Sequence, residues 1–245
     1  QSRLAVLARE RPREGEACDA VLVDLLHKEL VLGDVIEGPD EDPRAGSQLA
    51  EVHDEHLEDR DQARAILQGV VAESPDHLDA LRRLEQIELR AGDAEGLLAN
   101  LEKQLRVAVT AEQKLQLLRR IAGLHEQEFH DRAEAARAYE RMLEVDSEAT
   151  EVLERLAQHY LALEDVPSLA RTLERQADAL EDGPARVAKL IEIGRLHADR
   201  TGDVGAALRA CEAALALEPN HRQALDLLAA LRASAGDDDL AIEAI

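Results

Sequence analysis

Nine histidines and 52 carboxylates give this sequence many side chains that could bind a metal ion or transfer a proton. The segment from His125 to His130 is close to the pattern in which two histidines on one helix bind zinc. That pattern needs histidines four residues apart, whereas these are five apart and point about 140° away from each other on a helix. The segment therefore lacks the spacing of a catalytic zinc site.

A second candidate metal pair is His53 and His56, which are three residues apart and could share one helix face. At the corresponding positions 72 and 144 residues further along, Glu128 and Arg200 replace the second histidine, and no third ligand is spaced to join the pair. We expect no metal site and no cofactor, and interpret the pair as solvated. A metal-linked assembly through it is kept as an alternative.

The sequence has no other pattern typical of an active site. It contains no phosphate-binding glycine loop, no nucleophile elbow and no closely spaced cysteine pair. Its two cysteines, Cys18 and Cys211, are too few and too far apart for a disulfide framework. We therefore expect no enzymatic activity within this chain.

The composition favours packed helices and excludes several kinds of partner. The net charge of −23 on 245 residues repels phosphate backbones and anionic lipid. Apolar residues make up 45%, too many for a disordered acidic tail, while the aromatics are two Tyr and one Phe. The longest apolar run, residues 20–32, is interrupted by charges and cannot insert into a membrane. We expect a cytoplasmic location, a bacterial type of sequence, and a piece of a longer protein.

The elements that would position any site come from an internal repeat of 72 residues. Each unit has two related halves, marked by aspartates spaced 34, 38, 34, 38 and 34 residues apart. These aspartates are Asp59, Asp93, Asp131, Asp165, Asp203 and Asp237. Other residues that recur at 72 are His53, His125 and His197, and Ala63, Ala135 and Ala207. We interpret the recurring histidines as packing residues, because they are four helices apart and cannot share a ligand.

Each half-unit predicts two helices that meet at the aspartate. Helical periodicity precedes it, as in Leu81-Leu84-Ile87, and resumes after it. An aspartate there can cap the second helix through its free amides. The glycines Gly92, Gly202 and Gly236 suit the end of the first helix, and Pro75 and Pro219 follow the second. Small alanines at the recurring positions allow close helix packing.

The residues Ile193-Gly194, His197, Gly202-Asp203, Ala207, Cys211, Ala214, Leu217 and Pro219-Asn220 resemble the consensus of the tetratricopeptide repeat family. The resemblance implies an all-α, right-handed superhelical solenoid of antiparallel helix pairs over residues 44–245, with about six repeats and the last one truncated. The sequence departs from the family in lacking several aromatics, and in one extra residue before the turn of each first half-unit. We interpret residues 1–43 as a degenerate helical half-unit that ends in an acidic loop.

The family's groove-facing positions, carried over to this sequence, predict a peptide-binding groove rich in arginine. Guanidinium groups favour carboxylates, so we expect an acidic peptide or a C-terminal carboxylate as ligand. The alternative is that nearby acids on the same faces, Glu126, Glu151, Glu154 and Asp199, neutralise the arginines. The predicted groove residues are Arg82, Arg83, Gln86, Arg90, Arg119, Arg120, Arg155, Gln158 and Arg195.

The sequence thus predicts a non-catalytic scaffold or adaptor segment that binds a peptide or helix of another protein. One alternative is a regulatory or oligomerising arm of a larger enzyme or signalling protein. A basic protein could also dock on the acidic outer face, and terminal repeats that expose apolar faces could self-associate.

Overall fold

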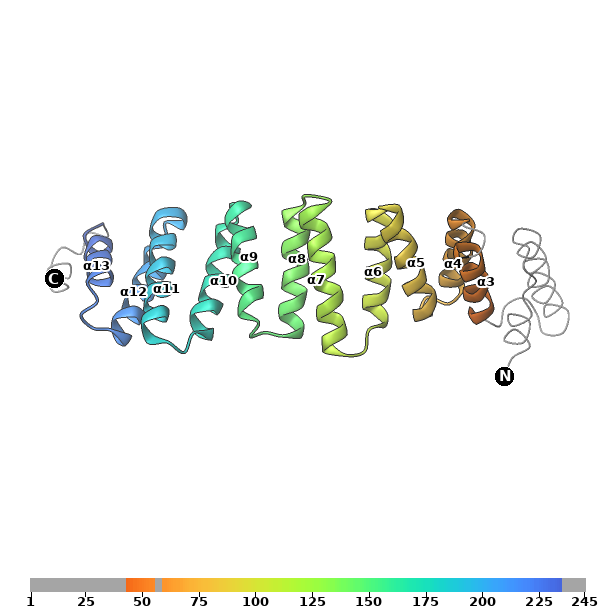
Figure 1. Cartoon of the computed structure of the whole chain (residues 1–245). Coiled ribbons are helices and arrows are strands. Elements are labelled where there is room, and N and C mark those ends of the chain that lie inside the picture. The colour runs from red at the N-terminus through yellow and green to blue at the C-terminus, as the bar shows by residue number, and fades with distance from the viewer. Residues whose placement is uncertain (1–42, 56–58, 235–245) are drawn as a thin grey trace, which may run out of the picture. The chain divides into compact units, whose positions relative to one another are not determined.

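The computed structural model describes residues 43–55 and 59–234, in which every regular element is a helix and none is a strand (Figure 1). The all-α class is therefore confirmed over this part of the chain. Its helices are α3 (Pro43–Glu55), α4 (Arg60–Glu73), α5 (Leu78–Ala91), α6 (Ala94–Val107), α7 (Ala111–Gln127), α8 (Arg132–Val145), α9 (Thr150–Ala162), α10 (Val166–Ala179), α11 (Gly183–Leu196), the π-helical turn η1 (His197–Thr201), α12 (Val204–Leu217) and α13 (Arg222–Ser234).

The chain divides into two compact units between Val107 and Ala108. In the first unit α3 packs against α4 and α5 against α6. In the second unit each helix from α7 to α13 contacts the next one along the chain, as expected of a solenoid of helix pairs. All but Pro43 of the half-unit and acidic loop predicted for residues 1–43, and the last aspartate, Asp237, lie outside the described residues. Pro43, which the sequence places in a loop, begins α3, because proline needs no amide partner in a first helical turn.

The predicted aspartate caps are present at every described junction. Asp59, Asp131, Asp165 and Asp203 each accept a hydrogen bond from an amide in the first turn of the following helix. Asp93 does the same for the amide of Gly96 at 2.9 Å. This local rule explains why the aspartate spacing alone located the hairpin turns.

The residue before the aspartate adopts a left-handed conformation at four of these junctions. Gly92 and Gly202 both have φ of 67°, as the sequence predicts for the end of the first helix. His130 and Glu164 occupy the equivalent positions with φ of 52° and 57°. The turn therefore imposes this geometry even where the residue is not glycine, at a cost in conformational energy.

The extra residue of the first half-units changes the bond that closes the turn. In the shorter half-units the amides of Asp93 and Asp165 bond to carbonyls five residues back, those of Glu88 and Tyr160. In the longer ones the amides of Asp59 and Asp131 bond to carbonyls six residues back. In the third longer half-unit the helix widens into η1. The insertion is thus absorbed at the end of the first helix, either in the bond that closes the turn or in η1.

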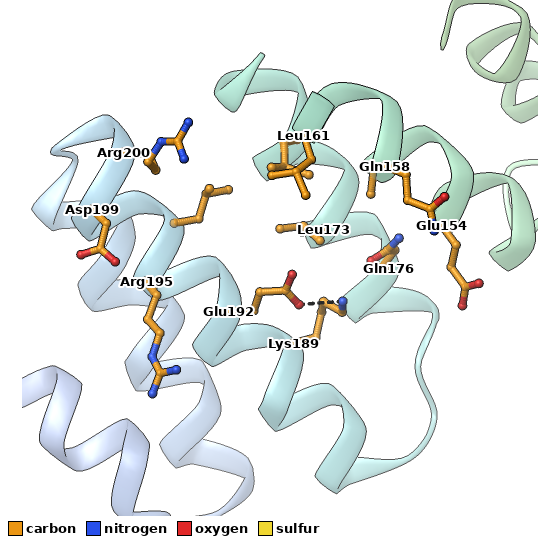
Figure 2. Close-up of a pocket in the computed structure, with 13 residues that line it drawn as sticks. Glu154, Gln158, Leu161, Leu173, Gln176, Lys189, Glu192, Arg195, Asp199 and Arg200 are labelled. Carbon is orange, nitrogen blue, oxygen red and sulfur yellow. Dashed lines mark hydrogen bonds and ion pairs between the residues drawn. The ribbon is translucent and has the colours of Figure 1, made fainter. Parts of the chain in front are cut away.

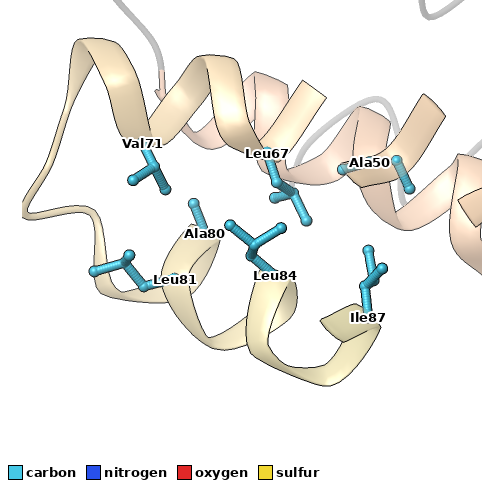
Figure 3. Packing of buried hydrophobic residues seen from close by; sticks show 8 residues of the cluster. Ala50, Leu67, Val71, Ala80, Leu81, Leu84 and Ile87 are labelled. Carbon is cyan, nitrogen blue, oxygen red and sulfur yellow. The ribbon is translucent and has the colours of Figure 1, made fainter. Parts of the chain in front are cut away.

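Helix packing relies on aliphatic residues and on the recurring alanines. In the first unit α3, α4 and α5 enclose a core of fully or almost fully buried residues (Figure 3). The predicted small residues Ala63, Ala135 and Ala207 are all 0% exposed. Their lack of bulk lets neighbouring helices approach closely. The core shown consists of Ala50, Ala63, Leu67, Val71, Ala80, Leu81, Leu84 and Ile87.

Candidate functional site

Four of the predicted groove residues lie on α5 in the first unit. Arg82, Gln86 and Arg90 are exposed, and Arg83 is half-buried. Two of these arginines are paired with acids from α3. Arg83 lies 2.9 Å from a carboxylate oxygen of Glu51, and Arg90 donates a hydrogen bond of 2.9 Å to Asp54. Neutralisation by acids therefore occurs here, through residues other than those that the sequence suggested.

The other five predicted residues lie in the second unit, and the structure brings only some of them to a cavity. Arg119 and Arg120 are exposed on α7 and line neither of the two cavities described here. Arg155 and Gln158 on α9 line the smaller cavity. Gln158 also lines the larger one, together with Arg195 of α11. Gln158 is thus common to both.

The larger cavity, of about 580 Å³, lies among α9, α10, α11 and η1, and we call it the α9–α11 groove. Figure 2 shows Glu154 and Gln158 on one side, Arg195, Asp199 and Arg200 on the other, and Leu161 and Leu173 between them. Its lining residues are Glu154, Ala157, Gln158, Leu161, Leu169, Leu173, Gln176, Lys189, Glu192, Arg195, Leu196, Asp199 and Arg200.

The groove combines an apolar floor with a charged rim. Leu169 and Leu173 of α10 are buried at its base, whereas Leu161 of α9 is 59% exposed. On the rim, Lys189 and Glu192 form an ion pair of 2.7 Å. Such a surface can hold the apolar side chains of a bound segment and hydrogen-bond to its polar groups.

The smaller cavity, of about 260 Å³, is formed by α7, the turn after it, the start of α8, and α9, and we call it the α7–α9 pocket. Its lining residues are Glu126, His130, Arg132, Arg155, Gln158 and His159. One oxygen of Glu126 accepts hydrogen bonds from Tyr139 Oη at 3.0 Å and from His159 Nε2 at 2.7 Å. Burial and the Glu126 carboxylate raise the pKa of Tyr139 to about 12, so its hydroxyl remains a donor.

The recurring histidines are packing residues. His53 is buried among its neighbours, and neither of its ring nitrogens has a hydrogen-bond partner among the described residues. The ring of His125 lies 5.6 Å from that of Phe129, and His197 Nδ1 lies 3.2 Å from the hydroxyl of Thr201. His56, the other half of the candidate metal pair, lies outside the described residues, within which no three His, Cys, Asp or Glu side chains cluster as metal ligands.

Cys211 is a core residue, as its position in the repeat predicts. It is 0% exposed, and burial raises the pKa of its thiol to about 11. A thiol that is protonated and shielded from solvent is a poor nucleophile.

Three residues that shape the two cavities were missed by the sequence reasoning. His159 follows His125 by 34 residues, the spacing of the half-units, and that spacing could have identified it. Arg132 lies directly after the capping Asp131, a position that carries no signal of its own. Leu161 has the spacing of a helix face but no feature that would set it apart from core leucines.

Similar solved structures show the fold. A chain in the structure of Naa15/Naa10 bound to HypK-THB aligns with 92% of this chain, and the alignment covers 35% of the matched chain, with 14% identity and a TM-score of 0.50. YrrB, described as a TPR protein with an unusual peptide-binding site, matches 79% of this chain and 95% of its own, with 14% identity and a TM-score of 0.37. A tetratricopeptide repeat protein from Parabacteroides merdae ATCC 43184 matches 82% and 77%, with 16% identity and a TM-score of 0.37.

The all-α solenoid fold that the resemblance to tetratricopeptide repeats implies is thus supported by the helix order and by the likeness to the Naa15 structure, which is a likeness of fold alone. The sequence matches no family model and no curated protein. No helix in the described part of the chain combines the length and the apolar character that crossing a membrane requires.

Proposed function

We propose that this chain is a non-catalytic scaffold or adaptor that binds a peptide segment or helix of another protein in the α9–α11 groove. The observation that carries the proposal is the groove itself, about 580 Å³ of space between helices with a leucine floor and a charged rim. Grooves between helices bind amphipathic segments by taking up their apolar side chains while the rim contacts their polar ones.

The exposed leucine of the groove supports a macromolecular ligand. Leu161 is 59% exposed, although a side chain of this size gains about 1.5–3 kcal/mol when it is fully buried. A bound segment would supply that burial. The exposed leucine therefore serves as a contact point for an apolar residue of the partner.

The rim of the groove is balanced in charge although the chain is strongly acidic. Its three acids, Glu154, Glu192 and Asp199, are matched by Lys189, Arg195 and Arg200. Neither Arg195 nor Arg200 forms an ion pair with the residues that the structure describes. These two guanidinium groups support an acidic contact from the ligand.

The arginines that the sequence predicts for the groove of the second unit, Arg119, Arg120, Arg155 and Arg195, remain part of the proposal, and those of α5 are proposed separately for the first unit. If the arginines of the second unit bind one acidic ligand, reversing the charge of Arg119 would weaken capture of that ligand. Unchanged affinity would restrict the site to the α9–α11 groove.

The test is selection of binding peptides from a random library on the wild-type chain, followed by affinity measurements with two matched variants. Leu161→Glu places a charge on the floor of the groove. Leu217→Glu makes the same change at a 46% exposed leucine of α12 that does not line the groove. We expect Leu161→Glu to weaken the selected peptides at least tenfold and Leu217→Glu to leave them unchanged. Equal affinity for both variants and the wild type, or no enriched peptide, would contradict the proposal.

A further inference from the structure

The α7–α9 pocket has the features of a small anion site built into the second unit. It is formed by three separate segments, namely α7, the turn into α8, and α9. His130 in that turn has φ of 52°, and its Nδ1 lies 3.1 Å from the main-chain oxygen of Glu126. The turn geometry thus fixes the position of this ring at the edge of the pocket.

Two arginines of the pocket have no acidic partner among the residues that the structure describes. Neither Arg132 nor Arg155 forms an ion pair or a hydrogen bond with any residue that the structure describes. By contrast, Arg83 and Arg90 of the first unit are paired with acids. In a chain with a net charge of −23, two unpaired guanidinium groups beside one cavity form a local reversal of charge.

The one carboxylate of the pocket is already engaged by other donors. Glu126 Oε1 accepts hydrogen bonds from Tyr139 and from His159, and the rings of these two residues lie 5.5 Å apart. His159 is only 6% exposed, and its Nδ1 is buried without a hydrogen-bond partner among the described residues. These two hydrogen bonds occupy one oxygen of Glu126, which forms no ion pair with Arg132 or Arg155 within the described part of the chain.

We propose that the α7–α9 pocket binds the carboxylate of an acidic side chain in a bound peptide, with Arg132 and Arg155 as its main contacts. A guanidinium group pairs with a carboxylate through two parallel N–H donors. The pocket of about 260 Å³ lies below the range of about 300–1,000 Å³ typical of sites for drug-sized molecules, and suits the end of one side chain.

The position of the pocket connects it to the proposed function, on which the peptide part of this inference rests. Gln158 of α9 lines both the pocket and the α9–α11 groove. A segment lying in the groove can therefore reach the pocket with a neighbouring Asp or Glu side chain. The pocket would then select ligands with an acidic residue beside their apolar contacts.

The carboxylate site can be tested without any peptide. Propionate and its neutral analogue propionamide are titrated into the chain, and NMR signals of the His159 ring and the Gln158 amide are followed. We expect saturable shifts with propionate at millimolar concentrations and at least tenfold weaker binding of propionamide. The double variant Arg132→Gln and Arg155→Gln should weaken propionate at least tenfold. Arg209→Gln, an exposed arginine of α12 outside the pocket, is the matched control and should change nothing.

Three results would overturn the inference. These are equal shifts with propionate and propionamide, unchanged propionate binding in the double variant, or tighter binding of inorganic phosphate than of propionate at the same signals. A second experiment uses the peptides selected for binding to the groove. Replacing one Glu of such a peptide by Gln should weaken its binding to the wild-type chain but not to the double variant. If the proposed groove function is wrong, no peptide would bind, whereas propionate would still bind to the α7–α9 pocket.

Discussion

The left-handed residues before two of the capping aspartates, Asp165 and Asp203, predict the sign of two substitutions in the second unit. Glu164 has φ of 57°, and its side chain is exposed without a hydrogen bond or ion pair among the described residues. A left-handed conformation costs a residue with a Cβ about 1–2 kcal/mol. Glycine avoids this cost but loses about 0.4–1 kcal/mol through its greater freedom in the unfolded chain. Glu164→Gly should therefore stabilise the fold by about 0.5–1 kcal/mol.

Two glycine substitutions provide matched controls with opposite expected signs. Gly202 has φ of 67° and an added Cβ would touch nothing within 4 Å, so Gly202→Ala isolates the conformational cost. It should destabilise by about 1 kcal/mol. Gly123 lies inside α7, where an added Cβ also meets nothing within 4 Å. Gly123→Ala should stabilise by about 1 kcal/mol, because glycine is a poor helix former.

The assay is urea unfolding followed by circular dichroism, supported by thermal melts. A change of 1 kcal/mol shifts the melting temperature of a chain of this size by about 2–4 °C. The expected order of midpoints is Gly202→Ala below the wild type, and both Glu164→Gly and Gly123→Ala above it. A lower midpoint for Glu164→Gly, or a higher one for Gly202→Ala, would refute the assignment of these turns.

Three further predictions follow from single side chains. Asp131→Ala removes the acceptor for the amides of Ala133 and Glu134 and should cost about 1 kcal/mol in urea unfolding; an unchanged midpoint would show that the cap contributes nothing. Cys211 should not react with a thiol reagent at pH 8 until the chain unfolds, because its pKa is raised to about 11 and it is fully buried; rapid labelling of Cys211 itself in the folded chain would contradict this. The pKa of Tyr139 rises from 10.0 to about 12 on folding, so the protonated hydroxyl contributes its full share to the free energy of unfolding below pH 10, and this share is lost as the pH rises toward 12. Tyr139→Phe should make the free energy of unfolding fall less steeply over this pH range. An equally steep fall in the variant would contradict the prediction.

Local features of the fold could be predicted from the sequence because they depend on neighbouring residues. An aspartate bonds to amides two or three residues away, so the spacing of Asp131 and Asp165 located helix starts directly. The left-handed conformation of Gly92 could be predicted for the same reason, because it depends on residues within the same turn. The boundary between the two units at Val107 and Ala108 could not be predicted, since the 72-residue period continues through it.

The candidate site was only partly predictable because its character depends on pairs that are distant in the sequence. The resemblance to tetratricopeptide repeats, through the family's groove-facing positions, pointed to Arg155, Gln158 and Arg195, which line the cavities. Whether an arginine is free or paired depends on side chains many residues away, as in the pair of Arg90 with Asp54, separated by 36 positions. The same holds for the contact of His159 with Glu126 across 33 positions. No periodicity in the sequence encodes such contacts.

The most direct test of the proposed function is to locate a selected peptide on the second unit. The peptide carries a nitroxide spin label, and the loss of signal is measured for leucine methyl groups by NMR. We expect strong attenuation at Leu161, Leu173 and Leu196, which line the α9–α11 groove, and little at Leu228 and Leu231 in the core between α12 and α13. Attenuation at Leu228 and Leu231 without effect on the groove leucines would contradict the proposal.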